Sequence, residues 1–225
     1  VIFINYEDFY KEIKKISDNN KQKKITIFSG YDCDSLAFDT ISGFADKALD
    51  FFGKNPDLEL ELRTKSIATR ALLKREPISN CIVAFSLSPA NIADALDRRA
   101  PSIRKRIKMI KKLAKHGWKI GLRFDPLIYC SGWEKLYGEL FENIFRGLDN
   151  NDVHSVSFGP LRFPKKMFYK IEKLRPTDKL FAFPLKEEKG QVSYGRNIES
   201  LMYKYLEVQL QKYTSGSKIF QCVIQ

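Results

Sequence analysis

The chain has 225 residues, of which 44% are hydrophobic and 13% aromatic, so it can bury one sizeable core and a disordered tail is excluded. Thirty-nine Lys and Arg residues against 27 Asp and Glu residues leave a formal net charge of +12. A surplus of this size attracts polyanions, either nucleic acid or an anionic membrane face, although an A+T-rich genome also produces lysine-rich proteins.

The cysteines are scattered singly along the chain, at Cys33, Cys81, Cys130 and Cys222, and no two of them form a CxxC pair. Only two histidines accompany them. This spacing argues against a closed zinc site and against a disulfide framework, so we expect no metal ligands in this chain. Single cysteines suit a reducing cytosol.

No apolar run approaches the roughly 18–20 residues that a helix needs to span a bilayer. A signal peptide is not expected either, because the chain opens with the strand-like run Val1–Ile4 and not with a basic region and an apolar core. We therefore expect a cytoplasmic protein with no membrane partner. The opening run carries no methionine, and we expect that a preceding segment was removed.

Short apolar, β-branched runs alternate with stretches of helical periodicity along the chain. The predicted strands are Ile25–Ser29, Leu58–Arg63, Cys81–Leu87, Trp118–Phe124 and Val153–Phe158. The predicted helices are Tyr6–Ile16, Leu36–Phe52, Ser66–Lys74, Ser102–Lys115, Trp133–Leu148 and Pro164–Leu174. Beyond them, Tyr194–Tyr213 is typical of a terminal helix and Lys218–Ile224 of a last strand at the sheet edge.

Five strand–helix repeats in series predict βαβ units and a parallel sheet with right-handed crossovers. The pattern leaves two layouts open, a doubly wound open sheet and a (β/α) barrel. No G-x-G-x-x-G follows any strand, so a Rossmann dinucleotide site has no support. In either layout, ligands bind at the carboxyl ends of the strands.

Small, polar or charged residues lie at the end of each predicted strand or directly after it. They are Ser29, Gly30, Tyr31, Cys33, Asp34, Lys65, Ser86, Arg123, Asp125 and Arg162. Together they predict one rim that suits a zwitterionic or anionic ligand. Taken singly, each has an ordinary alternative, such as a turn at Asp125, a solvated Lys65 or a half-buried Cys33.

Two stretches are strongly basic. The predicted helix Ser102–Lys115 carries six cations on its outer face, and Arg106 adds a seventh nearby, but such a face is most often plain solvated surface. The stretch Arg162–Lys170, with Lys165 and Lys166, interleaves cations with aromatic residues, which suits phosphate contact and base stacking. The alternative there is a helix with aromatic residues in the core.

The strand ends and the segments after them read, in order, S-G-Y-D-C-D-S, L-E-L-R-T-K, V-A-F-S-L-S-P, A-P-S-I-R-K-R, H-G-W-K-I-G-L-R-F-D-P and G-W-E-K-L-Y-G-E-L-F. This order resembles the spore photoproduct lyase family of radical S-adenosylmethionine enzymes, which reverse a thymine dimer in DNA. The resemblance runs from about Val1 to Arg162 and more faintly to the end. It implies an α/β fold, a partial (β/α) TIM-type barrel with parallel strands over residues 1–175, and residues 176–225 as a C-terminal extension packing on the barrel.

The resemblance assigns cofactor contacts to the first three strand ends. Lys65 lies where the family has a lysine that contacts the methionyl carboxylate of S-adenosylmethionine, and an ammonium group can pair with that carboxylate. Ser86 matches a serine near the same cofactor, and Asp34 lies within the segment that meets the methionyl amino group. Gly30, after Ser29, allows the backbone to approach closely.

The chain departs from the family at two points. The hallmark CxxxCxxC-type loop, whose three thiolates hold a [4Fe–4S] cluster, is not found in this sequence. In the family that loop lies just before the segment matching Val1–Tyr10, so we expect the cluster ligands N-terminal to this chain. The family also uses a cysteine after the first of these strands as a hydrogen-atom donor. The gapless match puts Tyr31 there, with Cys33 two residues later, and either could serve as the donor.

The resemblance implies an enzyme, a radical S-adenosylmethionine lyase that reverses a thymine-dimer-type lesion in DNA by radical C–C bond cleavage. Its partners would be DNA and a reductant such as a flavodoxin or ferredoxin. The residues expected to contact the substrate are Arg123, Asp125, Arg162, Lys165 and Lys166. Two alternatives stay open: a nucleic-acid-binding module that has lost the cluster, and a radical enzyme of the same fold that modifies RNA or protein.

Overall fold

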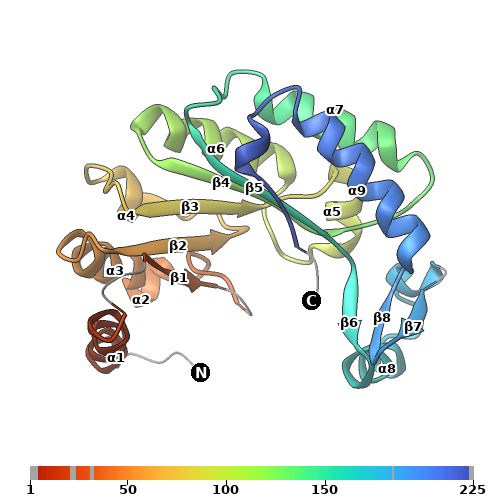
Figure 1. Cartoon of the computed structure of the whole chain (residues 1–225), viewed down its shortest axis with the longest axis horizontal. Coiled ribbons are helices and arrows are strands. Elements are labelled where there is room, and N and C mark those ends of the chain that lie inside the picture. Colours follow the sequence, from red (N-terminus) through yellow and green to blue (C-terminus); the bar gives the residue numbers. More distant parts are fainter. Residues whose placement is uncertain (1–4, 21–23, 31–32, 184, 223–225) are drawn as a thin grey trace. The chain divides into compact units, whose positions relative to one another are not determined.

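The main sheet of the protein has six strands, which lie in the order β1-β2-β3-β4-β5-β9. Figure 1 shows them in a computed structural model that describes residues 5–20, 24–30, 33–183 and 185–222. The strands are β1 (Ile25–Ser29), β2 (Leu58–Thr64), β3 (Cys81–Ser86), β4 (Lys119–Leu127), β5 (Val153–Pro160) and β9 (Ile219–Gln221).

The order of the strands distinguishes between the two predicted layouts. It follows the chain from β1 to β5 without the reversal that a doubly wound sheet requires. The β1–β2, β2–β3 and β5–β9 pairs are parallel. The prediction of an α/β fold with a partial (β/α) barrel of parallel strands is therefore confirmed.

The chain divides into two compact units. The first consists of Val1–Ser86 and Lys105–Gly121, and the second of Leu87–Arg104 and Leu122–Gln225. The predicted boundary between residues 175 and 176 falls inside the second unit and stays a prediction.

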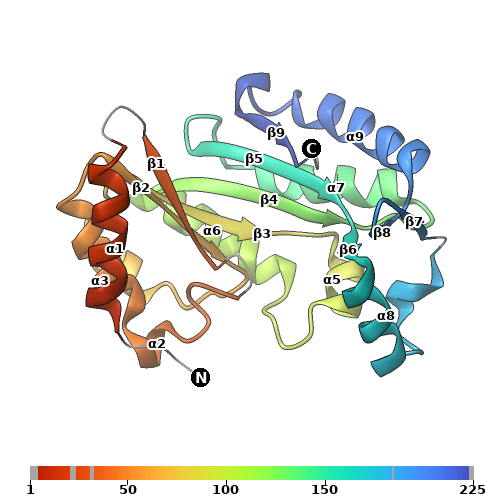
Figure 2. The same ribbon diagram turned by 60° about the horizontal axis from the view of Figure 1, so that its bottom comes forward.

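The first unit carries most of the helices that precede β4. They are α1 (Tyr6–Asp18), α2 (Asp39–Ser42), α3 (Phe44–Gly53), α4 (Arg70–Leu73) and, from Lys105 onward, α6 (Ile103–His116). Figure 2 shows α1 and α3 on the same side of β1 and β2.

The core of the first unit lies between β2 and α3. Leu58, Leu60 and Leu62 of β2 are at most 1% exposed, and Leu60 lines a cavity together with Ala48 and Phe52 of α3. Leucine alternates with a charged residue along β2, and this period of two directs the leucines to the helix side and the charges to the other face.

Arg106 corrects the sequence analysis, which put it beside the outer face of α6. The residue is fully buried, and its Nη1 donates a hydrogen bond of 3.0 Å to the carbonyl oxygen of Ser86. The cause is helical spacing, because Ile103, Arg106, Ile110 and Leu113 follow one another at intervals of three, four and three and so share the core face.

The predicted helix Leu36–Phe52 is interrupted at Gly43, whose φ of 60° ends α2 before α3 begins. The predicted helix Ser66–Lys74 was largely wrong, since only Arg70–Leu73 is helical. Its first residues are held otherwise: the Ser66 amide donates to Thr64 Oγ1 and the Ala68 amide to Ser66 Oγ. Such local side-chain acceptors compete with helix formation.

The second unit contains elements that the sequence patterns did not predict. They are α5 (Ala90–Leu96) and a three-stranded antiparallel sheet in the order β6-β8-β7, with β6 at Arg162–Pro164, β8 at Gln191–Ser193 and β7 at Lys186–Glu188. Lys189 and Gly190, with φ of 51° and 78°, form the two-residue turn between β7 and β8. Each strand of this sheet has three residues, too few for an alternating pattern to be recognised.

The other elements of the second unit agree with the predictions in type. They are α7 (Trp133–Phe145), α8 (Lys165–Leu174) and α9 (Arg196–Leu210), whereas the 3₁₀ turns at Lys179–Ala182 and Gly216–Lys218 were not predicted. The predicted last strand is present as β9 beside β5, and residues 223–224 of its predicted range lie outside the described residues. In the described part of the chain, no helix is both long and apolar enough for a membrane span.

Candidate active site

The parallel register of the first three strands brings their carboxyl ends to one edge. Ser29 lies opposite Leu62 and Thr64 lies opposite Phe85, so the segments that follow β1, β2 and β3 leave the sheet side by side. We call this edge, with Gly30, Asp34, Lys65 and Ser86, the strand-end edge.

Asp34 joins the loop after β1 to the end of β2. Its Oδ1 accepts hydrogen bonds from the amides of Leu36 and Ala37, both at 2.9 Å, and from Thr64 Oγ1 at 2.7 Å. Its Oδ2 accepts from the Lys65 amide at 2.7 Å. The carboxylate that was predicted to lie near the methionyl amino group thus holds the loop in place through four donors.

Gly30 allows the backbone of the loop after β1 to lie close to the end of β2. Its φ is +81°, and a Cβ added there would lie 2.6 Å from the Arg63 carbonyl oxygen and 2.7 Å from Ser35 Oγ. The Ser35 amide also donates to the Arg63 carbonyl at 3.0 Å. Only glycine therefore fits between the loop and the end of β2.

The remaining side chains of the predicted cofactor set have distinct surroundings. Lys65 and Ser86 are half-buried at the ends of β2 and β3, and the Ser86 carbonyl is the acceptor for Arg106. Cys33 presents an exposed thiol in the loop after β1. Tyr31, the other predicted hydrogen-atom donor, lies outside the described residues.

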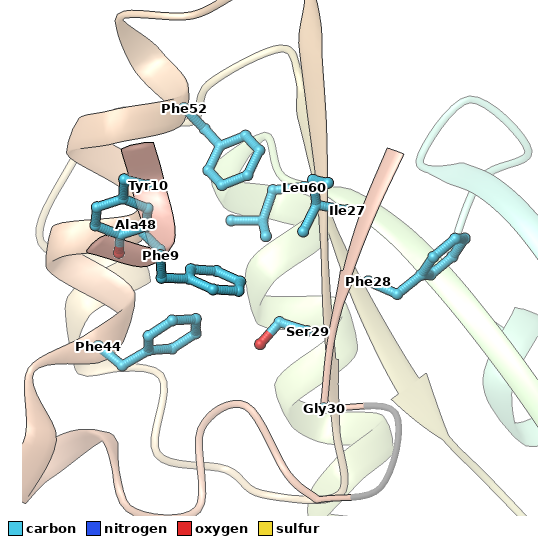
Figure 3. Close-up of a pocket in the computed structure, with 10 residues that line it drawn as sticks. All are labelled: Phe9, Tyr10, Ile27, Phe28, Ser29, Gly30, Phe44, Ala48, Phe52 and Leu60. Atoms are coloured by element: carbon cyan, nitrogen blue, oxygen red, sulfur yellow. The ribbon is translucent and has the colours of Figure 1, made fainter. Parts of the chain in front are cut away.

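A cavity of about 220 Å³ lies beside β1, on the side of the sheet that α1 and α3 cover. Figure 3 shows Ser29 pointing toward it, near Phe44, and Phe28 pointing the opposite way. The Ser29 hydroxyl accepts a hydrogen bond of 3.0 Å from Ser35 Oγ. Burial raises the pKa of Tyr10, which also lines the cavity, to about 12. The Ser29 side chain therefore helps to hold the loop after β1 in place.

The opposite face of β2 carries charged side chains, and the sequence analysis missed them. Glu59 accepts a hydrogen bond of 3.1 Å from Thr26 and also pairs with Lys24, while Glu61 accepts from Arg63 Nη2 at 3.1 Å. The glutamates are 6% and 2% exposed. The strict alternation L-E-L-E-L-R was the available signal, since it puts every charge of β2 on one face.

Within the second unit, the strand ends supply one ion pair. Arg162 Nη2 lies 3.5 Å from Asp125 Oδ2, and Arg162 Nη1 donates to the Cys222 carbonyl at 3.1 Å. Arg123 is 4% exposed and donates to the carbonyl and hydroxyl oxygens of Ser155 at 3.1 and 2.9 Å. Its guanidinium thus joins β4 to β5, whereas the Asp125–Arg162 pair is partly accessible.

Lys165 and Lys166 begin α8, and both are exposed. Lys165 Nζ lies 2.7 Å from Glu187 Oε1, and Tyr169 donates to the other oxygen of that carboxylate at 3.1 Å. The hydrogen bonds to Glu187 raise the pKa of Lys165, and the hydrogen bond from Lys165 lowers the pKa of Glu187. Of these two residues predicted to contact the substrate, Lys166 therefore presents its ammonium group to solvent, whereas Lys165 is paired with Glu187.

Metal-ligating side chains do not gather in the described residues: no three His, Cys, Asp or Glu side chains there could hold an ion together. Cys81 is fully buried, and burial raises the pKa of its thiol well above the usual range. The described part of this chain does not fit a [4Fe–4S] cluster.

Residues 1–222 match the family profile described as spore photoproduct lyase. The spore photoproduct lyase of Geobacillus sp. is 25% identical over 221 residues, which are 97% of this chain and 64% of that relative. The enzyme of Bacillus subtilis is 25% identical over 196 residues, 86% of this chain and 56% of the relative. The chain therefore spans somewhat less than two thirds of the length of these curated relatives.

Solved structures with the same fold cover the whole chain. A spore photoproduct lyase complexed with dinucleoside spore photoproduct has a TM-score of 0.85, 20% identity, and coverage of 100% of this chain and 68% of that one. A variant with bound AdoMet and dinucleoside spore photoproduct has a TM-score of 0.84 and 19% identity over the same shares. By its family profile and its relatives, this chain belongs to the spore photoproduct lyase family.

Proposed function

We propose that this chain forms the larger part of a radical S-adenosylmethionine lyase that acts on DNA and reverses a thymine-dimer-type lesion by radical C–C bond cleavage. The observation that carries the proposal is the strand-end edge of β1, β2 and β3 in a chain of this family. The curated relatives are lyases, and a solved relative of the same fold holds dinucleoside spore photoproduct.

The donor set of the strand-end edge fits the methionyl end of S-adenosylmethionine. Lys65 provides an ammonium group for its carboxylate, and Gly30 allows the loop after β1 to lie against β2. Since Asp34 already accepts four hydrogen bonds, we assign it the positioning of Lys65 and of the loop. Bound there, the cofactor would supply the radical chemistry that starts the reaction, the abstraction of a hydrogen atom from the lesion.

The cluster that this chemistry requires belongs, in this proposal, to the segment that precedes Val1. The support is the family resemblance and the lack of a fitting set of ligands among the described residues. Three cysteines spaced about as CxxxCxxC are expected there. A flavodoxin or ferredoxin in the reducing cytoplasm would supply the electron.

Two groups of side chains complete the proposed reaction. Cys33, with its exposed thiol in the loop after β1, would give its hydrogen atom to the product radical, or Tyr31 would do so in its place. The radical left on the donor would then regain a hydrogen atom from the nucleoside that carried off the first one. Arg162, paired with Asp125, and Lys166 contact the phosphates of the DNA, because their cationic groups are accessible near strand ends and at the start of α8.

Turnover of dimer-containing DNA is the test of this proposal. The protein that includes the preceding segment, reconstituted anaerobically, should restore thymines in a cofactor-dependent reaction. Cys33→Ala should lower turnover at least about tenfold if its thiol is the donor, since the product radical then lacks its source of hydrogen. The control Cys130→Ala, in the segment before α7, should retain full turnover.

The outcomes also separate the alternatives. An adaptor that had lost the cluster would give no iron–sulfur absorption after reconstitution and no cofactor cleavage. A radical enzyme for RNA or protein would cleave the cofactor but leave the dimer intact. Full turnover by Cys33→Ala, with loss in Tyr31→Phe, would assign the donor to Tyr31.

A further inference from the structure

The exposed cations of α6 lack acidic partners in the described part of the chain. The helix has 14 residues, seven of them Lys or Arg and none Asp or Glu. Four of its lysines are exposed, and no carboxylate of the described residues forms an ion pair with them. We call these four, Lys105, Lys108, Lys112 and Lys115, the α6 stripe.

Some exposed lysines on other helices of this chain have such partners on the same helix. On α1, Lys15 lies 2.6 Å from Glu12, and on α7, Lys135 lies 3.9 Å from Glu139. Both pairs have the i,i+3 or i,i+4 spacing that stabilises a helix. The α6 stripe differs from these helices because α6 contains no carboxylate of its own that could pair with a lysine.

The stripe opposes the stability of its own helix. Its members follow at intervals of three, four and three residues, and like charges at these spacings repel one another. Lys105 also lies in the first turn, where a cation meets the positive end of the helix dipole. A local conflict of this kind, retained without compensation inside the protein, points to a ligand that neutralises it.

The geometry of the stripe suits a phosphate backbone. From Lys105 to Lys115 it runs about 15 Å along a straight helix. One strand of duplex DNA has a phosphate every ~3.4 Å of axis, so the stripe spans about four. Its first member adjoins Arg106, whose guanidinium bonds to Ser86 at the end of β3, so the stripe begins at the level of the strand-end edge.

The composition of α6 favours nucleic acid over an acidic protein. The exposed large apolar side chains of the described residues all lie on other elements, and none is on α6. Protein–protein interfaces need an apolar centre, whereas protein–DNA interfaces are polar and strongly positive.

We propose that the α6 stripe binds the phosphate backbone of DNA outside the lesion, without reading its sequence. The inference rests on the proposed function only in the choice of DNA as the polyanion. The stripe adds affinity for long DNA and contributes nothing to recognition of a dinucleoside, which has no run of phosphates for it to bind.

The test compares two variants of equal net charge. The α6 variant carries Lys105→Gln, Lys108→Gln, Lys112→Gln and Lys115→Gln. The control variant carries Lys11→Gln, Lys15→Gln, Lys135→Gln and Lys212→Gln, so both fall from +12 to +8. Binding of each to an undamaged, labelled 20-base-pair duplex is followed by fluorescence anisotropy between 50 and 200 mM KCl, without cofactor or lesion.

In the α6 variant, the slope of log Kobs (the observed binding constant) against log salt concentration should become shallower by about two to four. Each phosphate that a lysine neutralises contributes ~0.9 to this slope. The slope of the control variant should stay unchanged. The melting temperature of the α6 variant should equal or exceed that of the parent, which excludes misfolding as the cause. Equal slopes in the two variants would overturn the proposal. Loss of affinity for a purified flavodoxin, with DNA binding intact, would overturn it in favour of an acidic protein partner.

Discussion

Asp34→Asn is expected to lower the free energy of unfolding by about 2–4 kcal/mol, although it removes only one oxygen acceptor. All four groups that contact the carboxylate are donors, namely the amides of Leu36, Ala37 and Lys65 and the hydroxyl of Thr64. An asparagine retains one acceptor oxygen and turns its NH₂ group toward another N–H. At least one buried donor is then left unsatisfied.

The measurement is urea unfolding of the chain at neutral pH, with Asp57→Asn as the control. Asp57 is an exposed carboxylate before β2, so its replacement should change stability by less than about 0.5 kcal/mol. If Asp34→Asn were as stable as the control and lost only cofactor affinity, Asp34 would be a direct ligand contact and the assigned positioning role would be wrong.

Among glycine-to-alanine substitutions in the first unit, Gly30→Ala is expected to lower stability most. The added Cβ meets the Arg63 carbonyl oxygen at 2.6 Å and Ser35 Oγ at 2.7 Å, and the backbone at φ +81° disfavours any side chain. Left-handed strain costs ~1–2 kcal/mol and overpacking a further ~1–3 kcal/mol, so we expect a total loss of about 3 kcal/mol.

Gly147→Ala provides the matched control. Its φ is +84° and nothing lies within 4 Å of an added Cβ, so it imposes the strain without the collision. The difference between the two variants in calorimetric unfolding isolates the close approach of the loop to β2. Equal destabilisation would mean that the loop yields freely and that Gly30 does not hold the strand-end edge.

The sequence predicted the main elements because their apolar periods were long enough to be read. β1 has the predicted bounds, and α6 differs from its predicted range by one residue at each end. The short strands of the small sheet could not be recognised, since three residues define no period. The helix expected from Ser66 begins only at Arg70, because residues 66–69 form local turns in which Thr64, Ser66 and Ile67 accept amide hydrogen bonds.

For the candidate site, the sequence predicted which segments come together but not which hydrogen bonds their side chains form. The rule that ligands meet the carboxyl ends of parallel strands identified the segments of Gly30, Asp34 and Lys65, and the structure brings these three together. It could not reveal that the Asp34 carboxylate would accept hydrogen bonds from groups of the chain itself, or that Arg123 would be buried against Ser155. Those outcomes depend on which donors the folded chain brings within reach, and one-dimensional spacing does not encode them.

The affinity of the reconstituted protein for S-adenosylmethionine, measured by isothermal titration calorimetry, tests whether Lys65, at the strand-end edge, holds the methionyl carboxylate. Lys65→Ala should weaken binding by roughly 10- to 100-fold, as expected for the loss of a hydrogen-bonded ion pair. The control Lys54→Ala, an exposed lysine after α3, should bind as the parent does. Unchanged affinity in Lys65→Ala would contradict the account.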